Sequence, residues 1–273
     1  MWTAVTLTPR HKLTTESIEI AIHPRFGTLN FRSGQFVVLE VQLEQGVRRS
    51  AFSIVRSERN GIIIGVKKNG DHGISAWLNN LQKPTKASLA GPFGQFQITP
   101  SAKKHIFITG GSGITPVRSM LDDLLGQEVE SILIYANQSP EQAMYLQSFR
   151  LLAQSNGITL IEVYDRNIFA ALQQVDCTGA AFYTCGPTGL IINALSAIQA
   201  HGIPEDGSKQ NCMGWIWTPR GNHRARLPGK AFGAVPKPSR WMDRKACLTA
   251  PSRAVSCFPM HAASECAEPA LQD

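Results

Sequence analysis

Short apolar runs separated by turn residues fill the first hundred positions of the chain. Runs of this length that are rich in β-branched residues are typical of strands. The predicted strands are Ala4 to Thr8, Ser17 to Ile22, Phe36 to Val41, Ala51 to Val55, Ile62 to Lys67 and Lys86 to Leu89. Only Gly73 to Leu81 has a helical pattern in this half. Several short strands with one helix predict a small antiparallel β-barrel domain over residues 1–100.

After Pro100 the pattern changes, because strands begin to alternate with helices. The predicted strands are 105–110, 131–136, 158–163 and 180–185, and the predicted helices are 116–126, 140–154, 167–174 and 187–201. This alternation predicts a parallel sheet with right-handed crossovers, in an α/β domain over residues 101–206. Ligands of such sheets bind beyond the carboxyl ends of the strands. The glycine-rich and polar loops of this half lie at those ends, which favours a nucleotide-binding domain.

The last segment, residues 207–273, shows neither the two-residue period of strands nor the 3.6-residue period of helices. It is dense in Gly, Pro, Arg and Trp, and it predicts an irregular, disordered basic tail. The chain has a formal net charge of +7, of which +6 falls in this tail, so we expect no nucleic acid as a partner of the main body. The abrupt change suggests that a shifted reading frame has replaced the native C-terminus. A genuine basic extension that docks an acidic partner or nucleic acid is the alternative.

The cysteines and the N-terminus bear on the class of protein. Four of the six cysteines lie in the tail, at spacings that match no common zinc or iron–sulfur pattern, so we expect no metal site. Met1 to Leu13 lacks the apolar core of a secretion signal. The uncharged stretch Cys177 to Ala200 is broken by Gly186-Pro187 and by polar residues, which argues against a membrane span. We therefore expect a cytoplasmic protein.

The sequence "HIFITGGSGITP" joins the first strand of the α/β half to its helix. Gly110, Gly111 and Gly113 allow a tight turn and a close approach of the backbone. Pro116 suits the first helical position, where a missing N–H costs nothing. A strand, a glycine turn and a helix start together form an anion site of backbone donors, which favours a nucleotide pyrophosphate over an ordinary turn. The spacing matches neither the ATPase phosphate loop nor the Gly-x-Gly-x-x-Gly of dehydrogenases.

Five motifs occur in an order that resembles the ferredoxin–NADP reductase superfamily, over about residues 3–206. They are "SGQFVVLEV" (33–41), "RRSAFSIV" (48–55), "GPFGQF" (91–96), "ITGGSGITP" (108–116) and "YTCGPTGLI" (183–191). The arrangement is most similar to the reductase components of bacterial oxygenases and desaturases. The resemblance implies a barrel that binds FAD, followed by an α/β domain that binds a nicotinamide nucleotide.

For the flavin, the resemblance first implicates "SAFSIV". Phe52 and Ser53 match the family's aromatic-Ser pair, in which the aromatic ring lies against the isoalloxazine and the hydroxyl bonds near N5. An ordinary strand with Phe52 facing the core is the alternative. The family pattern is Arg-x-Tyr/Phe-Ser, but Ser50 stands at the arginine position and Arg49 is one residue early. Arg49 can still pair with flavin phosphate if a bulge re-aims it.

A second flavin contact is implied at "DHGISAWL", where Gly73 and Ser75 match a turn of the family. The backbone N–H groups of Ile74 and Ser75 would face the flavin pyrophosphate. Ser75 also fits a simple N-cap, and Lys67 also fits a solvated edge charge. The implied flavin-binding set is Arg49, Ser50, Ala51, Phe52, Ser53, Ile54, Val66, Lys67, His72, Gly73, Ile74 and Ser75.

For the nicotinamide nucleotide, the resemblance implicates the Cys-Gly-Pro motif. Its cysteine, Cys185, packs beside the nicotinamide ring, a positional rather than nucleophilic role; a small buried apolar residue is the alternative. Thr115 is expected at the seam between the two rings. The implied set is Gly110, Gly111, Gly113, Thr115, Pro116, Asn137, Arg166, Cys185, Gly186 and Pro187. NADH is slightly favoured over NADPH, because Arg166 is the only cation near the position of a 2′-phosphate.

The implied function is that of a flavin-dependent oxidoreductase. Hydride passes from NAD(P)H to FAD, with Ser53, Thr115 and Cys185 as candidate catalytic residues. Single electrons then pass to an iron–sulfur or haem partner such as a ferredoxin or an oxygenase or desaturase component. The alternative is a non-catalytic subunit that uses flavin as a redox sensor, which the shifted Arg49 and the altered C-terminus keep open.

Overall fold

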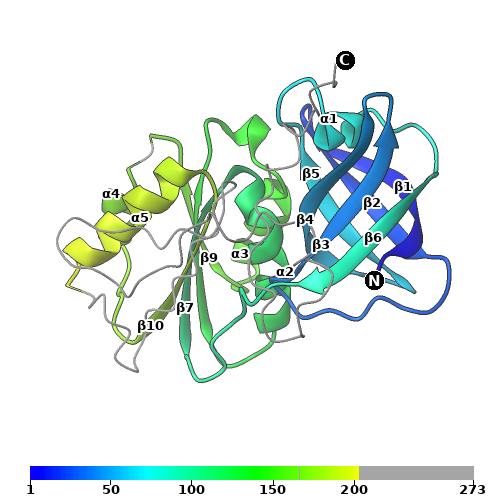
Figure 1. Ribbon diagram of the computed structural model, residues 1–273. Coiled ribbons are helices and arrows are strands. Elements are labelled where there is room, and N and C mark those ends of the chain that lie inside the picture. Colours follow the sequence, from blue (N-terminus) through cyan, green and yellow to red (C-terminus); the bar gives the residue numbers. More distant parts are fainter. Residues whose placement is uncertain (166, 203–273) are drawn as a thin grey trace, which may run out of the picture.

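The computed structural model describes residues 1–165 and 167–202, and its first six strands close into a barrel (Figure 1). The strands are β1 (Thr3–Thr14), β2 (Ser17–Pro24), β3 (Phe36–Leu43), β4 (Gly46–Glu58), β5 (Gly61–Lys67) and β6 (Thr85–Phe93). They pair antiparallel in the order β1-β2-β5-β4-β3-β6, and helix α1 (Ile74–Asn79) connects β5 to β6. The predicted antiparallel barrel is confirmed. The expectations for Arg166 and for the tail of residues 207–273 lie outside the described residues.

The apolar run of β5 shows why the barrel sequence does not alternate strictly. Ile62 and Ile64 belong to the barrel core, while Ile63 packs on the outside with Ala21 and Val55. All of these residues are buried. Because neighbouring residues of a strand point to opposite faces, a continuous apolar run means that both faces of β5 are covered. The outer face is covered by the second half of the molecule.

The second half is a four-stranded parallel sheet in the order β10-β7-β8-β9. Its elements are β7 (Lys104–Gly110), the 3-10 turn η1 (Gly111–Gly113), α2 (Ile114–Leu124), β8 (Glu130–Ala136), η2 (Pro140–Gln142), α3 (Leu146–Gln154), β9 (Thr159–Val163), α4 (Ile168–Leu172), β10 (Ala180–Cys185) and α5 (Thr188–Ala200). The predicted parallel sheet is confirmed. The predicted domain boundary after residue 100 falls between β6 and β7.

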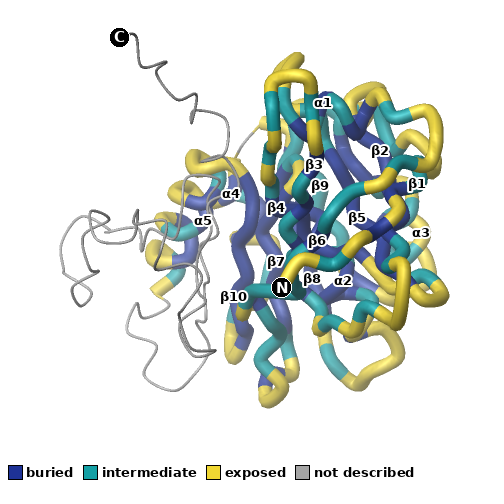
Figure 2. The backbone as a smooth tube through the Cα atoms, turned by 45° about the vertical axis from the view of Figure 1, so that its right-hand side comes forward, coloured by how far each residue is buried: buried dark blue, intermediate teal, exposed yellow. Residues whose placement is uncertain are grey.

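Helices cover both faces of the sheet, and each face has its own core. Phe107, Leu133 and Tyr183 pack toward α2 and α3, whereas Ile106 and Phe182 pack toward α4 and α5. Figure 1 shows α2 and α3 between the sheet and the barrel, with α4 and α5 on the far side, and Figure 2 shows the strands as the most deeply buried part. Burial on both faces explains the apolar strand sequences.

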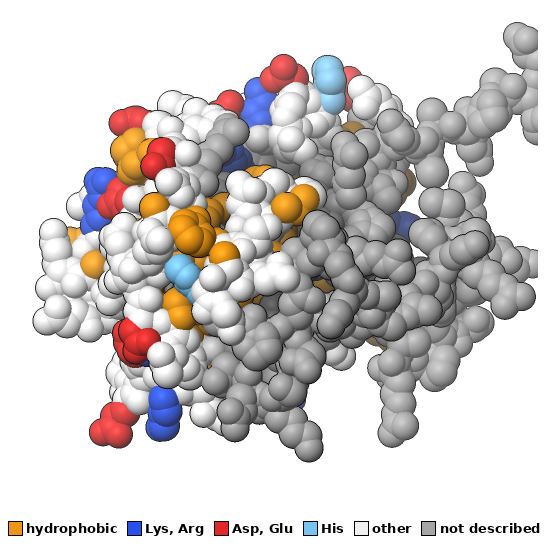
Figure 3. All heavy atoms as spheres, turned by 90° about the vertical axis from the view of Figure 1, so that its left-hand side faces the viewer, with side chains coloured by type: hydrophobic (Ala, Val, Ile, Leu, Met, Phe, Trp, Pro, Cys, Tyr) orange, Lys and Arg blue, Asp and Glu red, His pale blue; other side chains and the backbone are white. Residues whose placement is uncertain are grey.

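The outer side of the α4 and α5 layer carries exposed apolar side chains, which gather on the face shown in Figure 3. Phe169 is 44% exposed and Ile192 is 48% exposed. Helix α5 is rich in apolar residues and is 13 residues long. No helix within residues 1–165 and 167–202 is both long and apolar enough to cross a membrane.

Two helix predictions need correction. The segment predicted as one helix over 140–154 is a 3-10 turn followed by α3, because Tyr145 is left-handed with φ of 61° and interrupts the helix. Helix α2 begins at Ile114, so Pro116 is its third residue and not its first. Pro116 is still tolerated there, because the first four N–H groups of a helix have no partner within it.

The barrel and the sheet are joined through α2, which packs against β4. The buried Ser119 hydroxyl of α2 accepts a hydrogen bond of 3.0 Å from the amide of Gly34, just before β3. The same hydroxyl donates to the Pro116 carbonyl at 2.9 Å. A polar contact of this kind fixes α2, and with it the carboxyl end of β7, against the barrel.

Candidate nucleotide and flavin site

The glycine turn after β7 touches the Cys-Gly-Pro turn after β10. A Cβ atom on Gly113 would lie 2.3 Å from the carbonyl oxygen of Cys185 and 2.7 Å from the Cα of Gly186. The Thr109 hydroxyl donates to the same Cys185 carbonyl at 2.7 Å. Position 113 therefore requires glycine, because the backbones of the two turns are in direct contact. The structure brings these two predicted motifs together at the carboxyl end of the sheet.

Gly111 and Asn137 lie at the open side of this contact. Gly111 has φ of 55°, and a Cβ atom added to it would have no other atom within 4 Å. The Gly111 amide donates to the Asn137 Oδ1 atom at 3.4 Å. The buried Asn137 Nδ2 and the buried hydroxyl of Thr184 have no hydrogen-bond partner among the described residues. Because buried polar groups are normally paired, the Asn137 Nδ2 donor beside the left-handed Gly111 fits a polar ligand such as a nucleotide.

Thr115 lies where the sheet meets the barrel. It is 3% exposed, and its hydroxyl donates to the Ser112 carbonyl at 2.8 Å. A Cβ on Gly65 of β5 would lie 2.9 Å from the Thr115 Cγ2 atom. Thr115 therefore connects the glycine turn to the outer surface of the barrel.

Cys185 is almost completely enclosed, at 1% exposure. Burial raises the pKa of its thiol to about 12. A thiol with such a pKa stays protonated at neutral pH and is a poor nucleophile. Its burial agrees with a side chain that packs rather than reacts. Pro187, which follows Gly186, is the N-cap residue of α5.

On the barrel side, the candidate residues of β4 lie on two opposite faces of the strand. Phe52 is 6% exposed and packs in the barrel core, opposite Val37. The alternative in which Phe52 faces the core therefore describes its side chain. Ile54, Val66 and Ile74 are buried in the same core. A ligand outside the barrel would meet the backbone of these residues rather than their side chains.

Arg49 and Ser53 lie on the other face of β4. The Arg49 Nε donates to a Glu40 carboxylate oxygen at 2.7 Å, and the guanidinium lies 5.1 Å from the centre of the Trp2 ring. The β3–β4 pairing runs without a shift from Phe36↔Ser53 to Leu43↔Gly46. The bulge expected to re-aim Arg49 is therefore absent from this pair of strands. Ser53 is 8% exposed.

The start of α1 differs from the expectation for Ser75. The N-cap residue is Gly73, with φ of 86°, and Ser75 is the second residue of the helix. The Ser75 hydroxyl instead accepts a hydrogen bond of 3.1 Å from the Asn69 amide. It thus closes the loop that carries the exposed His72. The N-cap assignment of Ser75 is wrong, and its hydroxyl holds the loop in place.

Sequence reasoning missed Gly65, Ser119 and Tyr145, which lie at the junction of the two halves. Of these three residues, only Gly65 could have been found from the sequence pattern. A glycine inside the apolar strand "GIIIGV" indicates a close approach by another part of the chain. Ser119 and Tyr145 both lie in segments predicted as ordinary helices. Within the described residues, no group of three or more His, Cys, Asp or Glu could hold a metal ion.

A closed antiparallel barrel is joined to a parallel sheet in this chain, with paired glycine turns at the carboxyl end of the sheet. The family model of the oxidoreductase NAD-binding domain matches residues 107–194. The ferredoxin NADP+ reductase from Neisseria gonorrhoeae with bound FAD and NADP is similar in structure, with a TM-score of 0.68 and 19% identity over 79% of this chain and 98% of that one. The chain therefore shares the fold of this structure, and its residues 107–194 match the oxidoreductase NAD-binding domain family.

Two curated relatives are subunits of oxygenase systems. The carnitine monooxygenase reductase subunit of Escherichia coli (strain K12) is 26% identical over 167 residues, which cover 59% of this chain and 52% of that protein. The phenoxybenzoate dioxygenase subunit beta of Ectopseudomonas oleovorans is 30% identical over 175 residues, which cover 61% and 53%. The chain thus spans about half the length of the curated relatives it matches.

Proposed function

We propose that this chain is an NAD(P)H-dependent flavoprotein reductase that takes a hydride from a nicotinamide nucleotide onto FAD and passes single electrons to a protein acceptor. The observation that carries the proposal is the contact of Gly113 with Cys185, which joins the two nucleotide-binding motifs beside the barrel. The match to an oxidoreductase NAD-binding domain and the reductase names of the relatives support it.

On the sheet side, the chain supplies binding and orientation. The glycine turn of Gly110, Gly111 and Gly113 offers backbone donors to the pyrophosphate, and Asn137 offers a free Nδ2 donor. Cys185, Gly186 and Pro187 form the opposite wall. Because Cys185 is a neutral thiol, it excludes water and orients the ring without reacting with it.

On the barrel side, FAD supplies the redox chemistry when bound, since it accepts two electrons and releases them singly. The Ser53 hydroxyl is the candidate donor near the reacting edge. The amides of Ile74 and Ser75 and the side chain of Lys67 are candidates for the pyrophosphate. Arg49 would have to exchange Glu40 for a phosphate, which its 58% exposed side chain allows.

NADH is the preferred donor in this proposal. A 2′-phosphate is normally held by Arg or Lys, and the loop Asn137 to Tyr145 carries Glu141 and no cation. Arg166 is the one cation predicted near that position. We expect NADH to reduce the protein at lower concentration than NADPH.

Anaerobic titration of the purified flavoprotein tests the proposal. We expect the visible flavin band to bleach on addition of NADH. Dithionite serves as the control, because it shows that the bound flavin is reducible. Flavin that dithionite reduces but neither nucleotide does would reject the reductase and favour the sensor, which the burial of Phe52 and the pairing of Arg49 with Glu40 also favour.

The acceptor is proposed as the iron–sulfur or haem component of an oxygenase or desaturase, or a ferredoxin. Two relatives named as subunits of a monooxygenase and a dioxygenase support an oxygenase component. Mixing the NADH-reduced protein with a plant-type ferredoxin and with a two-electron quinone separates one-electron from two-electron transfer. Faster oxidation by the ferredoxin supports the proposal, and oxidation by the quinone alone contradicts it.

A further inference from the structure

The junction between the barrel and the sheet contains a tyrosine that the proposed reaction does not use. Tyr145 lies between η2 and α3, in a left-handed conformation with φ of 61°. The preceding Met144 is fully buried, and its carbonyl accepts a hydrogen bond of 3.0 Å from the Tyr135 hydroxyl. Bulky residues rarely adopt this conformation, so the surrounding structure must hold the turn in place.

The Tyr145 ring leaves its own domain and packs on the outside of the barrel. Its neighbours there are Ala21 of β2, Val55 of β4 and Ile63 of β5, all of them buried. On the same strand β5, a Cβ at Gly65 would lie 2.7 Å from the Tyr145 hydroxyl oxygen. Carbon and oxygen atoms that are not bonded do not approach so closely. The tyrosine therefore occupies space that only glycine leaves open.

Thr115 of the candidate site rests on the same bare stretch of strand. A Cβ at Gly65 would lie 2.9 Å from the Thr115 Cγ2 atom and 3.1 Å from the Met144 Cε atom. Three side chains therefore pack at the same position on β5, over Gly65: Tyr145, Met144 and Thr115. Any change that moves Tyr145 away from Gly65 also changes how Thr115 packs against the barrel.

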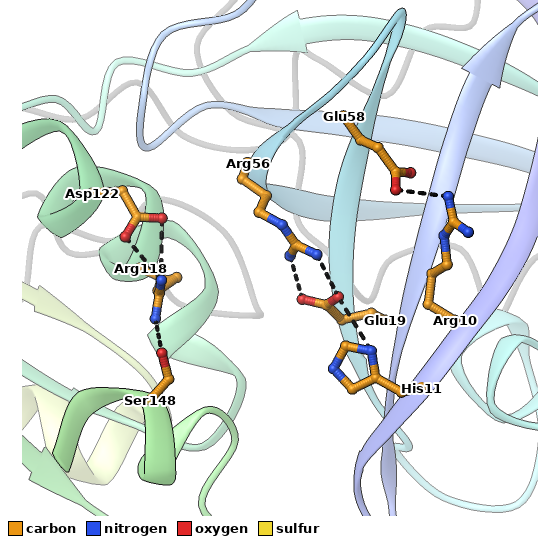
Figure 4. A network of polar contacts seen from close by, with 8 residues as sticks. All are labelled: Arg10, His11, Glu19, Arg56, Glu58, Arg118, Asp122 and Ser148. Carbon is orange, nitrogen blue, oxygen red and sulfur yellow. Dashed lines mark hydrogen bonds and ion pairs between the residues drawn. The ribbon is translucent and has the colours of Figure 1, made fainter. Parts of the chain in front are cut away.

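An ion pair between a half-exposed arginine and a buried carboxylate lies beside the polar end of the tyrosine. Glu19 lies directly opposite Gly65 in the β2–β5 pairing. Its carboxylate is 1% exposed and accepts hydrogen bonds of 2.6 and 2.9 Å from Arg56, which reaches across β5 from β4 (Figure 4). The His11 Nδ1 atom lies 3.9 Å away. The glycine leaves the space in which this pair and the tyrosine meet.

The Tyr145 hydroxyl is a donor held close to this ion pair. Burial and the neighbouring Glu19 carboxylate raise the pKa of Tyr145, so the hydroxyl keeps its proton. The hydroxyl oxygen is buried and has no other hydrogen-bond partner among the described residues. Its interaction with the Glu19 carboxylate in turn lowers the pKa of Glu19, so the ion pair helps to set the position of the tyrosine.

On the sheet side, a second cluster ties α2 to α3. The Arg118 Nε atom lies 3.0 Å from an Asp122 carboxylate oxygen, and its guanidinium also donates to the Ser148 hydroxyl (Figure 4). The same guanidinium lies over the Phe149 ring. Because Tyr145 directly precedes α3 and Thr115 lies in α2, this cluster couples the two residues.

We propose that Tyr145 is a positioning residue, which sits over Gly65 beside Glu19 and fixes the spacing between the barrel and the nucleotide end of the sheet. Through that spacing it places Thr115 between the two cofactor rings. This inference rests on the proposed function, since the spacing matters most for a hydride that must cross from one domain to the other.

The test combines Tyr145→Phe, Gly65→Ala and the double variant, with Tyr164→Phe as a matched control. Tyr164 is a half-exposed tyrosine whose hydroxyl donates to Glu162 within the sheet domain. The measured quantity is the rate of anaerobic flavin reduction by NADH in a single turnover. We expect Tyr145→Phe to slow it about threefold and Gly65→Ala about tenfold or more, with flavin content and NADH affinity unchanged.

The decisive result is that the effect of Tyr145→Phe on the rate of flavin reduction reverses when Gly65→Ala is also present. Removing the hydroxyl clears the atom nearest to the new Cβ at position 65, so Tyr145→Phe should speed reduction when Gly65→Ala is present. A residue with a merely structural role would slow the reaction in both backgrounds. Tyr164→Phe should behave as the unmodified protein, and an effect equal to that of Tyr145→Phe would overturn the proposal.

Hydrogen exchange gives a readout that does not depend on activity. We expect the amides of residues 141–146 to exchange faster in Gly65→Ala and to recover part of their protection in the double variant. If neither nucleotide reduces the unmodified protein, the proposed function fails, and the exchange data still decide the role of Tyr145. If Gly65→Ala does not fold, the comparison of Tyr145→Phe with Tyr164→Phe decides it, and equal rates and equal exchange reject the proposal.

Discussion

The two halves of the molecule hold their candidate residues in different ways. At the nucleotide end of the sheet, Gly113 touches the Cys185 carbonyl, and Thr109 donates to the same atom. On the barrel, Phe52 packs inward while Arg49 points outward to Glu40. The sheet residues are thus fixed against one another by backbone contact, whereas the barrel residues share a strand but not a face.

This difference explains where a sequence motif is informative. A glycine turn forms only if particular positions have no side chain, so the motif itself encodes the backbone contact. A strand motif encodes a row of residues, and a shift of one residue exchanges the two faces. In "RRSAFSIV" the arginine is one residue early, and that shift is enough to separate Arg49 from Phe52.

The largest expected effect concerns the contact on the sheet side. Gly113→Ala would place a Cβ 2.3 Å from the Cys185 carbonyl oxygen, against backbone that cannot rotate away. We expect the free energy of unfolding to fall by about 3 kcal/mol and flavin reduction by NADH to slow more than about tenfold. Urea denaturation and single-turnover reduction measure the two effects.

Gly111→Ala is the matched control in the same turn. Gly111 is left-handed with φ of 55°, but nothing lies within 4 Å of the added atom. Only the backbone strain remains, at about 1 kcal/mol. Equal losses in the two variants would show that conformation, not contact between the turns, decides this site.

Most of the fold could be predicted from the sequence, because it depends on period and on turns. All six barrel strands and the four parallel strands follow from apolar runs bounded by turn residues. The break at Tyr145 could not be predicted, since nothing local in "EQAMYLQSF" demands a left-handed residue. Contacts across the junction produce that conformation, and they are not visible in a local pattern.

The candidate site divides in the same manner. Gly110, Gly113, Cys185 and Gly186 come together as the motifs imply. The direction of Phe52 and the partner of the Ser75 hydroxyl depend on strand parity and loop closure. Both features depend on contacts that form only when the barrel closes, so the local sequence does not reveal them.

A smaller effect is expected at the junction that links the two halves. Ser119→Ala removes the acceptor of the buried Gly34 amide. A buried N–H without a partner costs about 2 kcal/mol, so urea denaturation should show a loss of that size. Ser148→Ala removes a hydroxyl from the same helix layer without touching the barrel, and we expect it to cost less. The reverse order would mean that α2 does not hold the two halves together through Gly34.

The pH dependence of stability should also distinguish the halves. Burial lowers the pKa of His105 in β7 below its usual 6.5, although a backbone hydrogen bond with Ala102 opposes the shift. The unfolded chain therefore binds more protons than the folded chain as pH falls below 6.5. The free energy of unfolding is then fully present above pH 6.5 and declines below it.

In the barrel, burial alone would raise the pKa of Glu19, but Arg56, Tyr145 and His11 lower it overall, below 4.5. Its contribution is present above pH 4.5 and is lost only as pH falls further. Urea denaturation across pH 7.5 to 4 should show two separate declines. His105→Gln should remove the first and leave the second, with the exposed His72→Gln as control; a first decline that survives His105→Gln contradicts this assignment.

The smallest effect on stability is expected at Arg49, because its contacts on the barrel are exposed to solvent. Arg49→Ala breaks an exposed pair with Glu40 and a contact with Trp2, which should cost less than about 1 kcal/mol in urea denaturation. If its guanidinium exchanges Glu40 for a flavin phosphate, FAD affinity should fall about tenfold. Arg48→Ala is the control, because Arg48 lies on the opposite face of β4, across from Val41. A larger loss of FAD affinity in Arg48→Ala would mean that flavin meets the other face of the strand, and Arg49 would then have no part in binding it.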